Sequence, residues 1–380
     1  MHILILPSWY VSSYNSLMGV FFKEQAEALI KEGHKVGVIA IQGVGVRQVV
    51  EQKKLDFSNR YFVENGVHTY RKQYPDIKLD SFIKQMKMLL FVRMFEKYIK
   101  EQGLPDIVHL HSFLAGDFAL YIKEKYNVPF VVTEHLSAFS RDRLSVNDID
   151  KAKRVFEKSA YNISVSHQFV ELLQDKFALE FNYIPNIVNI DFFQLKKVVK
   201  NDGYHFINIA FLDKNKNQSM LIQAFSNAFK NKSNVKLTIV GNGVEYKNLD
   251  KLIIDLKMEN QISLYGKASR EEVRRLLQNS DAFVLSSQVE TFGVVVIEAM
   301  ACGLPVIATK CGGPESIINS DKVGLLSELD ENKFSEKMLE VYYNRENYDC
   351  HYIRKYVEEN FSEKAVSLKL NDVYEKVLKK

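Results

Sequence analysis

The chain contains few cysteines. Cys302, Cys311 and Cys350 are the only three among 380 residues, so they cannot form an even set of disulfides, and their spacing matches no metal-binding pair. A content this low is typical of free thiols in a reducing compartment. We therefore expect a cytoplasmic protein.

Long apolar runs and concentrated charge are absent too. No apolar stretch reaches the length of a membrane span, and the N-terminal segment lacks the charged region and cleavage site of an export signal. The net charge of +4 is spread along the chain and not collected in a tail, which argues against nucleic acid as a partner. An anionic substrate and an anionic membrane face fit this balance equally well.

The length exceeds what a single hydrophobic core usually supports, so two domains are expected. Apolar strands alternate with amphipathic helices in both halves, a pattern typical of an α/β fold with parallel sheets. We expect Rossmann-like, doubly wound domains over residues 1–190 and 191–361, and then a C-terminal amphipathic helix over 362–380. The segment 191–204 lacks a clear period and is the expected linker.

The stretch 281–314 is the most informative part of the sequence. A buried strand at 282–285 is followed by a polar break, a helix and a second strand at 306–309. In a parallel sheet the ligand crevice lies where strands end and the next helices begin, because unpaired N–H groups point there. The N–H groups of Phe292, Gly293 and Val294 would face it, and Gly293 has no side chain to keep a phosphate away.

Two carboxylates flank this helix start. Glu290 lies at its mouth and Glu298 lies inside the helix. Carboxylates repel phosphates but accept hydrogen bonds from hydroxyl groups, and a nucleotide sugar carries hydroxyls on both its ribose and its hexose.

The motifs of this stretch follow one another in a set order: Ser287, Glu290, Phe292-Gly293, Glu298-Ala299-Met300 and Gly303-Leu304-Pro305-Val306. This order resembles the signature of retaining glycosyltransferases of family four, which have the GT-B fold of two Rossmann-like domains facing a cleft. The resemblance implies a nucleotide-sugar donor on the C-terminal domain and a saccharide or lipid-linked acceptor on the N-terminal domain. It also implies that the last helix crosses back onto the N-terminal domain.

Residue roles follow from the same resemblance. Glu298 would hold the ribose and Glu290 the hexose, while His135 matches a histidine that contacts the transferred sugar. Cleavage of the sugar–diphosphate bond leaves negative charge on the phosphate, so a fixed cation is needed there. Lys216 matches the phosphate lysine of the family and would act together with the amides at 292–294.

The phosphate site departs from the family pattern at two places. Phe211 stands where the family usually has arginine, so either Lys214 supplies the second charge or the donor is held more weakly. Near the first strand, Gly19 opens a loop that faces donor phosphate in the family, but Leu17 and Met18 stand where a further glycine is common.

The nucleotide base is expected farther along the crevice, against Gly241 and the strand end Tyr265-Gly266-Lys267, and uridine is the common base in similar enzymes. No Asp-x-Asp motif follows a suitable strand, so we expect no metal and no cofactor besides the donor. His109 and His111 share a strand face, but no further ligand joins them locally. We expect them to border the cleft.

Residues 81–102 form a predicted basic amphipathic helix with two interpretations. It could pack on the core with a solvated lysine face, or it could lie on the inner face of a membrane, where lipid-linked acceptors are found.

The sequence thus favours a metal-independent hexosyltransferase that uses a UDP-sugar with retention, in bacterial surface polysaccharide assembly. Two rivals stay open: a nucleotide-sugar epimerase on the same scaffold, and a weakly active or non-catalytic donor-binding subunit, which Phe211 motivates.

Overall fold

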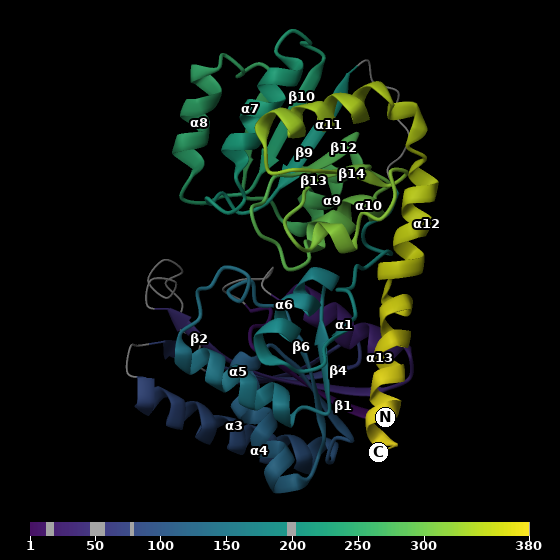
Figure 1. The fold of residues 1–380 in the computed structure, drawn as a ribbon. Helices are drawn as coiled ribbons and strands as arrows, with labels where there is room; N and C mark the ends of the chain where they lie inside the picture. The colour runs from purple at the N-terminus through teal and green to yellow at the C-terminus, as the bar shows by residue number, and fades with distance from the viewer. Residues whose placement is uncertain (13–18, 46–57, 77–79, 196–202, 380) are drawn as a thin grey trace. The chain divides into compact units, whose positions relative to one another are not determined.

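The computed structural model describes residues 1–12, 19–45, 58–76, 80–195 and 203–379 (Figure 1). The chain forms two compact units. The first comprises Met1–Val165, Val170–Ile187 and Val366–Lys380, and the second comprises Ser166–Phe169 and Val188–Ala365. Each unit is built on its own sheet, entirely parallel in the second unit and parallel but for one edge pairing in the first, in agreement with the predicted GT-B fold class.

The sheet of the first unit has eight strands in the order β3-β4-β2-β1-β5-β6-β7-β8. All its pairings are parallel except that of β3 with β4. The strands are β1 His2–Pro7, β2 Lys35–Gly45, β3 Asn59–Glu64, β4 Val67–Asp76, β5 Ile107–His111, β6 Phe130–Glu134, β7 Tyr161–Ser164 and β8 Asn182–Tyr183.

The β3–β4 hairpin was not predicted from the sequence. Its two-residue turn is Asn65-Gly66, with φ of 49° and 82°. Both central residues of a type I′ turn need positive φ, and Asn-Gly is the pair that adopts it most readily. That dipeptide was the signal available in the sequence.

The helices that lie wholly or mostly in the first unit are α1 Val20–Lys31, α3 Asp80–Gln102, α4 Gly116–Tyr126, α5 Val146–Lys158, α6 His167–Phe177 and α13 Glu363–Leu378. Helix α13 inserts Val366, Leu370, Val373, Tyr374 and Val377 into the core formed by β1, β2 and α1. The predicted return of the last helix to the N-terminal domain is therefore confirmed, on the apolar face that the sequence indicated.

Helix α5 corrects one prediction. From the sequence alone, the segment 137–150 is interpreted as a mobile acceptor-side loop, with the next helix beginning at Lys151, but α5 already begins at Val146. The hydroxyl of Ser145 accepts the N–H of Asp148, whose carboxylate in turn accepts the N–H of Ser145. This capping box fixes the start of the helix five residues earlier than apolar periodicity alone suggested.

Helix α3 occupies the predicted basic amphipathic segment. Phe91, Phe95 and Tyr98 are fully buried against the sheet, whereas Leu89 is exposed. These contacts favour the core-packing interpretation, and membrane contact through α3 stays a prediction. No helix in the described parts of the chain is both long and apolar enough to cross a bilayer.

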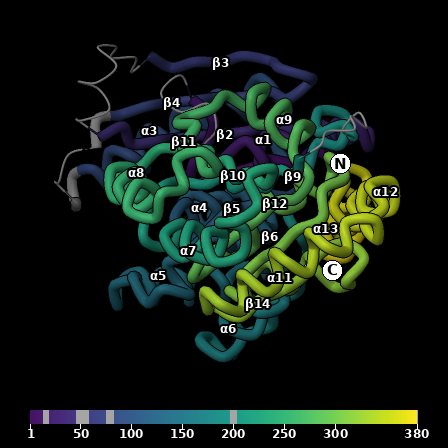
Figure 2. The backbone as a smooth tube through the Cα atoms, turned by 90° about the horizontal axis from the view of Figure 1, so that it is seen from above, coloured from purple at the N-terminus to yellow at the C-terminus, as the bar shows by residue number. Residues whose placement is uncertain are grey.

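The sheet of the second unit has six parallel strands in the order β11-β10-β9-β12-β13-β14. They are β9 Tyr204–Ile209, β10 Val235–Val240, β11 Ile262–Gly266, β12 Ala282–Leu285, β13 Val306–Thr309 and β14 Gly324–Ser327. The helices are α7 Gln218–Phe229, α8 Tyr246–Asp255, α9 Arg270–Gln278, α10 Val294–Ala301, α11 Glu331–Tyr343 and α12 Cys350–Phe361. Figure 2 shows the backbone of the same chain turned by 90° from the view of Figure 1.

The order of these strands places a switch point within the second unit. From β9 the chain builds β10 and β11 on one side of the sheet, and it returns to place β12, β13 and β14 on the other. The loops after β9 and β12 therefore leave adjacent strands in opposite directions. Such a switch point is where open α/β sheets bind ligands.

Candidate active site

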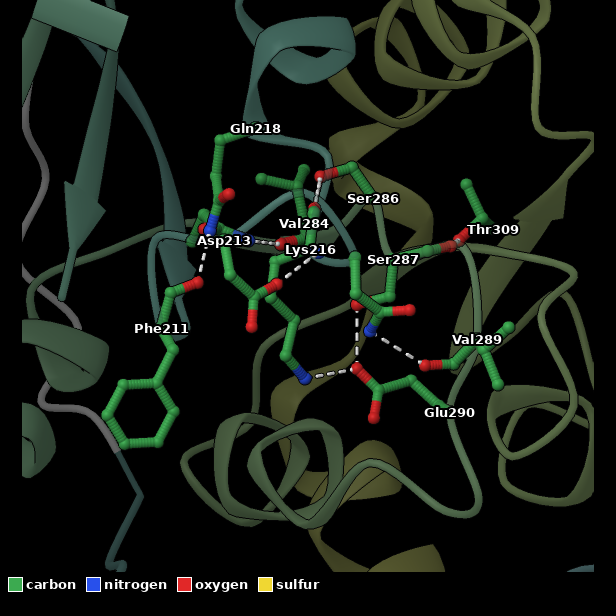
Figure 3. A network of polar contacts seen from close by, with 12 residues as sticks. Phe211, Asp213, Lys216, Gln218, Val284, Ser286, Ser287, Val289, Glu290 and Thr309 are labelled. Carbon is green, nitrogen blue, oxygen red and sulfur yellow. Dashed lines mark hydrogen bonds and ion pairs between the residues drawn. The ribbon is translucent and has the colours of Figure 1, made fainter. Parts of the chain in front are cut away.

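An ion pair joins the two loops at this switch point. Lys216, in the loop after β9, places its Nζ 2.5 Å from Oε1 of Glu290, in the loop after β12 (Figure 3). The hydroxyl of Ser287 donates to the same oxygen at 2.6 Å. Both charged side chains are largely buried, with 21% and 13% of their surface exposed, so the cation and the carboxylate are held in one place.

Further hydrogen bonds fix the two loops to each other. The N–H of Gln288 donates to the carbonyl of Asn215 at 2.7 Å, and the Asn215 side chain donates to the carbonyl of Val289 at 3.0 Å. The Ser286 hydroxyl donates to the carbonyl of Lys216 at 2.8 Å. A site braced in this way is preorganised, which lowers the cost of aligning a substrate.

The backbone of Glu290 is held from the other side by the loop after β13. Its N–H donates to the carbonyl of Cys311, and its carbonyl accepts the N–H of Gly313, both at 2.9 Å. The carboxylate of Glu315 accepts the N–H groups of Cys311 and Gly312. We did not identify this supporting loop from the sequence, although Gly312-Gly313-Pro314 directly after a strand was the available signal.

Helix α10 begins where the sequence indicated. Gly293 is its N-cap, with φ of 99°, and no side chain caps the first turn. The first N–H groups of a helix have no acceptor within the helix, so those near Val294 can bind an anion. The ring of Phe292 is buried, 6.0 Å from that of Phe361, so this residue can offer a ligand its backbone but not its side chain.

Glu298 lies within α10, as predicted, and is partly buried. Burial and then the Glu298 charge raise the pKa of the Cys302 thiol to about 12, which keeps this cysteine protonated. Cys302 is thus an inert core residue.

Phe211 lies in the same loop as Lys216, between β9 and α7. Its side chain is 70% exposed, and in Figure 3 its ring points away from the Lys216–Glu290 pair. Its carbonyl accepts a hydrogen bond from the Gln218 side chain at 2.9 Å, which ties the loop to the start of α7. Lys214, the alternative cation, is exposed in the same loop.

The residues expected to line the base site lie at the ends of β10, the neighbour of β9, and of β11, the strand beyond β10. The N–H of Gly241 donates to the carbonyl of Gly266 at 2.9 Å. A Cβ on Gly241 would lie 1.8 Å from the carbonyl oxygen of Ala210, so only glycine fits there. Tyr265 and Lys267 are exposed at this edge, and the Tyr265 hydroxyl donates to Glu272.

Two predicted residues belong to the first unit. Gly19 is the N-cap of α1 with φ of 76°, and a Cβ there would lie 2.9 Å from the carbonyl oxygen of Trp9. Leu17 and Met18 lie outside the described residues. His135 follows β6 and is 8% exposed, with its Nε2 lying 3.1 Å from Nδ1 of His111.

The expected pair of histidines on β5 is more enclosed than predicted. His109 and His111 are fully buried, with their rings stacked 4.2 Å apart, and so line no open surface of the unit. Within the described residues, no group of three histidine, cysteine, aspartate or glutamate side chains is placed to hold a metal ion. Metal independence stays a prediction.

Two known protein families match the chain, one in each half of the sequence. The family described as Glycosyltransferase Family 4 matches residues 18–192, and the family described as Glycosyl transferases group 1 matches residues 190–360. The chain belongs to the glycosyltransferases of family four. The transferase activity predicted from the 281–314 motifs is thereby confirmed at the level of glycosyl transfer.

The matches to similar proteins extend over most of the length of this glycosyltransferase. A probable sucrose-phosphate synthase of Thermosipho melanesiensis is 25% identical over 87% of this chain and 83% of its own. A sucrose-phosphate synthase structure from Thermosynechococcus elongatus has a TM-score of 0.78 at 19% identity, covering 99% of both chains. Anabaena Alr3699/HepE, solved with UDP, has a TM-score of 0.75 at 15% identity, covering 99% of this chain and 100% of that one. These two structures show the shared fold.

Proposed function

We propose that this glycosyltransferase moves a hexosyl group from a nucleotide-diphosphate sugar, UDP-linked in our proposal, to a saccharide or lipid-linked acceptor with retention. The observation that carries the proposal is the pairing of Lys216 with Glu290 at the switch point of the second unit. One group suits the phosphates and the other the sugar hydroxyls, and Glu290 lies three residues before Gly293, the N-cap of α10. UDP as the carrier is supported by the UDP complex of Anabaena Alr3699/HepE, which shares the fold.

The proposed transfer needs no side chain of the protein to accept the proton of the acceptor hydroxyl. The bond between the anomeric carbon and the leaving phosphate oxygen breaks, and the acceptor oxygen bonds to that carbon on the same face. The acceptor proton passes to the leaving phosphate. The Lys216 ammonium and the first N–H groups of α10 stabilise the charge that develops on that phosphate, and Glu290 and Glu298 hold the hexose and the ribose.

The acceptor side of the proposal assigns acceptor binding to the first unit, with His135 contacting the transferred hexose. We further propose bacterial surface glycan assembly as the setting and no metal or other cofactor in the reaction. These parts depend on the family resemblance of the 281–314 motifs and of the His135 position.

A Glu290→Ala variant tests the proposal. Transfer from a UDP-sugar, measured as UDP release together with the anomeric configuration of the product by NMR, should fall below detection while the thermal unfolding curve stays that of a folded protein. The matched control is Glu328→Ala, because Glu328 also pairs with a lysine of the second unit, Lys310, but is 64% exposed. Transfer by Glu290→Ala at the native rate would contradict the assigned role.

The same assay separates the two rivals. An epimerase would convert the donor alone, with no dependence on an acceptor. A non-catalytic donor-binding subunit, which the exposed Phe211 favours, would bind the donor and turn over none of a broad acceptor panel.

A further inference from the structure

A chain of buried polar side chains runs through the first unit behind His135. The hydroxyl of Tyr374, on α13, lies 2.6 Å from Nδ1 of His109. The side-chain nitrogen of Gln25, on α1, lies 3.3 Å from the same Nδ1 and 3.4 Å from Nε2 of His111. Nδ1 of His111 then meets Nε2 of His135 at 3.1 Å. Helices α13 and α1 thus both contact the histidines of β5, and His111 connects these contacts to His135.

The three histidines of this hydrogen-bonded network, His109, His111 and His135, are neutral. Burial lowers the pKa of His109 and of His135 to about 3, and it lowers the pKa of His111 well below its usual range. A neutral imidazole has one N–H donor and one lone-pair acceptor, so a neighbour that can only donate decides which nitrogen carries the proton.

Gln25 presents such a donor. Its amide N–H₂ faces Nε2 of His111, which must therefore accept, and His111 carries its proton on Nδ1. That N–H donates to Nε2 of His135, so the proton of His135 is on Nδ1.

The branch to Tyr374 is consistent with the same orientation. Burial raises the pKa of Tyr374, so its hydroxyl stays protonated and can donate to Nδ1 of His109. Nε2 of His109 then carries the proton and donates to the Thr133 hydroxyl at 2.8 Å. The single lone pair of His109 Nδ1 accepts from Tyr374, the nearer donor, so the Gln25 amide N–H is left to donate to Nε2 of His111.

We propose that Gln25 is a positioning residue that sets the tautomer of His135 through His111. Gln25 does not touch substrate in this proposal. It decides which nitrogen of His135 is the donor and fixes the plane of the ring. The consequence for catalysis rests on the proposed hexose contact of His135, whereas the tautomer itself does not.

The test uses the full chain labelled with ¹⁵N-histidine. Long-range ¹H–¹⁵N spectra distinguish a protonated from a bare ring nitrogen, and the His135 signals are assigned by their loss in His135→Asn. We expect Nδ1–H in the native protein, and a changed His135 pattern in Gln25→Met, which has similar size but no donor. If Gln25→Met fails to fold, Gln25→Asn withdraws the amide by one methylene and should act in the same direction.

Kinetics test the consequence. Gln25→Met should lower kcat roughly tenfold while KM for the donor changes by less than about twofold, as for groups that orient a functional side chain. Gln42→Met is the matched control, because Gln42 is a glutamine of the same unit that donates to the Tyr10 carbonyl outside the chain. It should leave both the spectra and kcat unchanged.

Three results would overturn the proposal: a native His135 protonated on Nε2, a His135 pattern unaffected by both Gln25 variants, or a changed pattern with native kcat. The spectra need no turnover, so a protein that transfers no sugar would refute the proposed function and leave the tautomer assignment open to confirmation or refutation by itself.

Discussion

Lys216 is paired with the carboxylate that we expect to hold the hexose. Donor binding must therefore exchange one anionic partner of the lysine for another. A second cationic side chain beside the phosphates would make this exchange easier, because two positively charged hydrogen-bond donors usually share a phosphate group. Phe211 occupies the position where the family usually has an arginine, which would be that second cation.

Phe211→Arg should consequently tighten UDP binding. Phe211 is 70% exposed, so the substitution should cost little stability, and a charge-assisted hydrogen bond near the surface is worth about 1.4 kcal/mol, or tenfold in Kd. Calorimetric titration with UDP measures the change. Phe211→Leu is the control and should not tighten binding; equal affinity of the arginine variant and the native protein would refute the idea that a cation is missing here.

Helix α10 depends on a residue with positive φ at its start. Gly293→Ala has room for its Cβ, which would lie 3.4 Å from Val296, but φ of 99° strains any other residue by about 1–3 kcal/mol. Relaxation of this strain would turn the first N–H groups, so we expect weaker UDP binding as well as a lower Tm. Gly33→Ala is the control, because Gly33 has φ of 83° and open space around it in the first unit. It should lower the Tm and leave UDP affinity unchanged.

Helix α13 offers a matched pair of leucines. Leu370 is 1% exposed in the core of the first unit, and Leu368 is 48% exposed on the same helix. Leu370→Ala should lower the free energy of unfolding by about 2–4 kcal/mol, and Leu368→Ala by less than about 0.5 kcal/mol. Urea unfolding followed by circular dichroism measures both; similar losses would mean that α13 is not held by its apolar face.

Local sequence patterns were enough to predict most elements. The strand at 306–309, the apolar face of α13 and the start of α10 were found because each depends on residues within one or two turns. The capping box at Ser145 and the Asn65-Gly66 turn were also local, and their signals were overlooked.

Contacts between distant segments could not be predicted in this way. Motifs identified Lys216 and Glu290 separately, but their pairing across 74 residues depends on the strand order, which no local pattern encodes. The contact of Gln25 with His111 depends equally on how α1 packs over β5.

The stability of the whole chain should depend on its buried histidines. His109 and His135 titrate near pH 3 when folded and near 6.5 when unfolded, so the unfolded state binds more protons between these values. Stability is then lost as the pH falls below 6.5, by about 2 kcal/mol per histidine at pH 5. The raised pKa of Glu134 acts in the opposite direction, because the folded state keeps that proton to higher pH.

A His109→Gln variant isolates this effect. Urea unfolding at pH 7 and pH 5 should show a smaller acid-induced loss for His109→Gln than for the native chain, whatever the difference between the two proteins at pH 7. His351→Gln, at an exposed site, should lose as much as the native chain. An unchanged acid loss in His109→Gln would exclude the buried imidazole as its cause.

The return of α13 to the first unit has a consequence for biosynthesis. The ribosome makes residues 1–187 first, but the segment that completes their core, from Val366 onward, emerges only after the entire second unit has been translated. Until then, the core residues against which α13 packs stay uncovered, whereas the second unit already has all its strands. A nascent chain stalled before residue 366 should therefore carry a protease-resistant second unit and a first unit that chaperones still recognise.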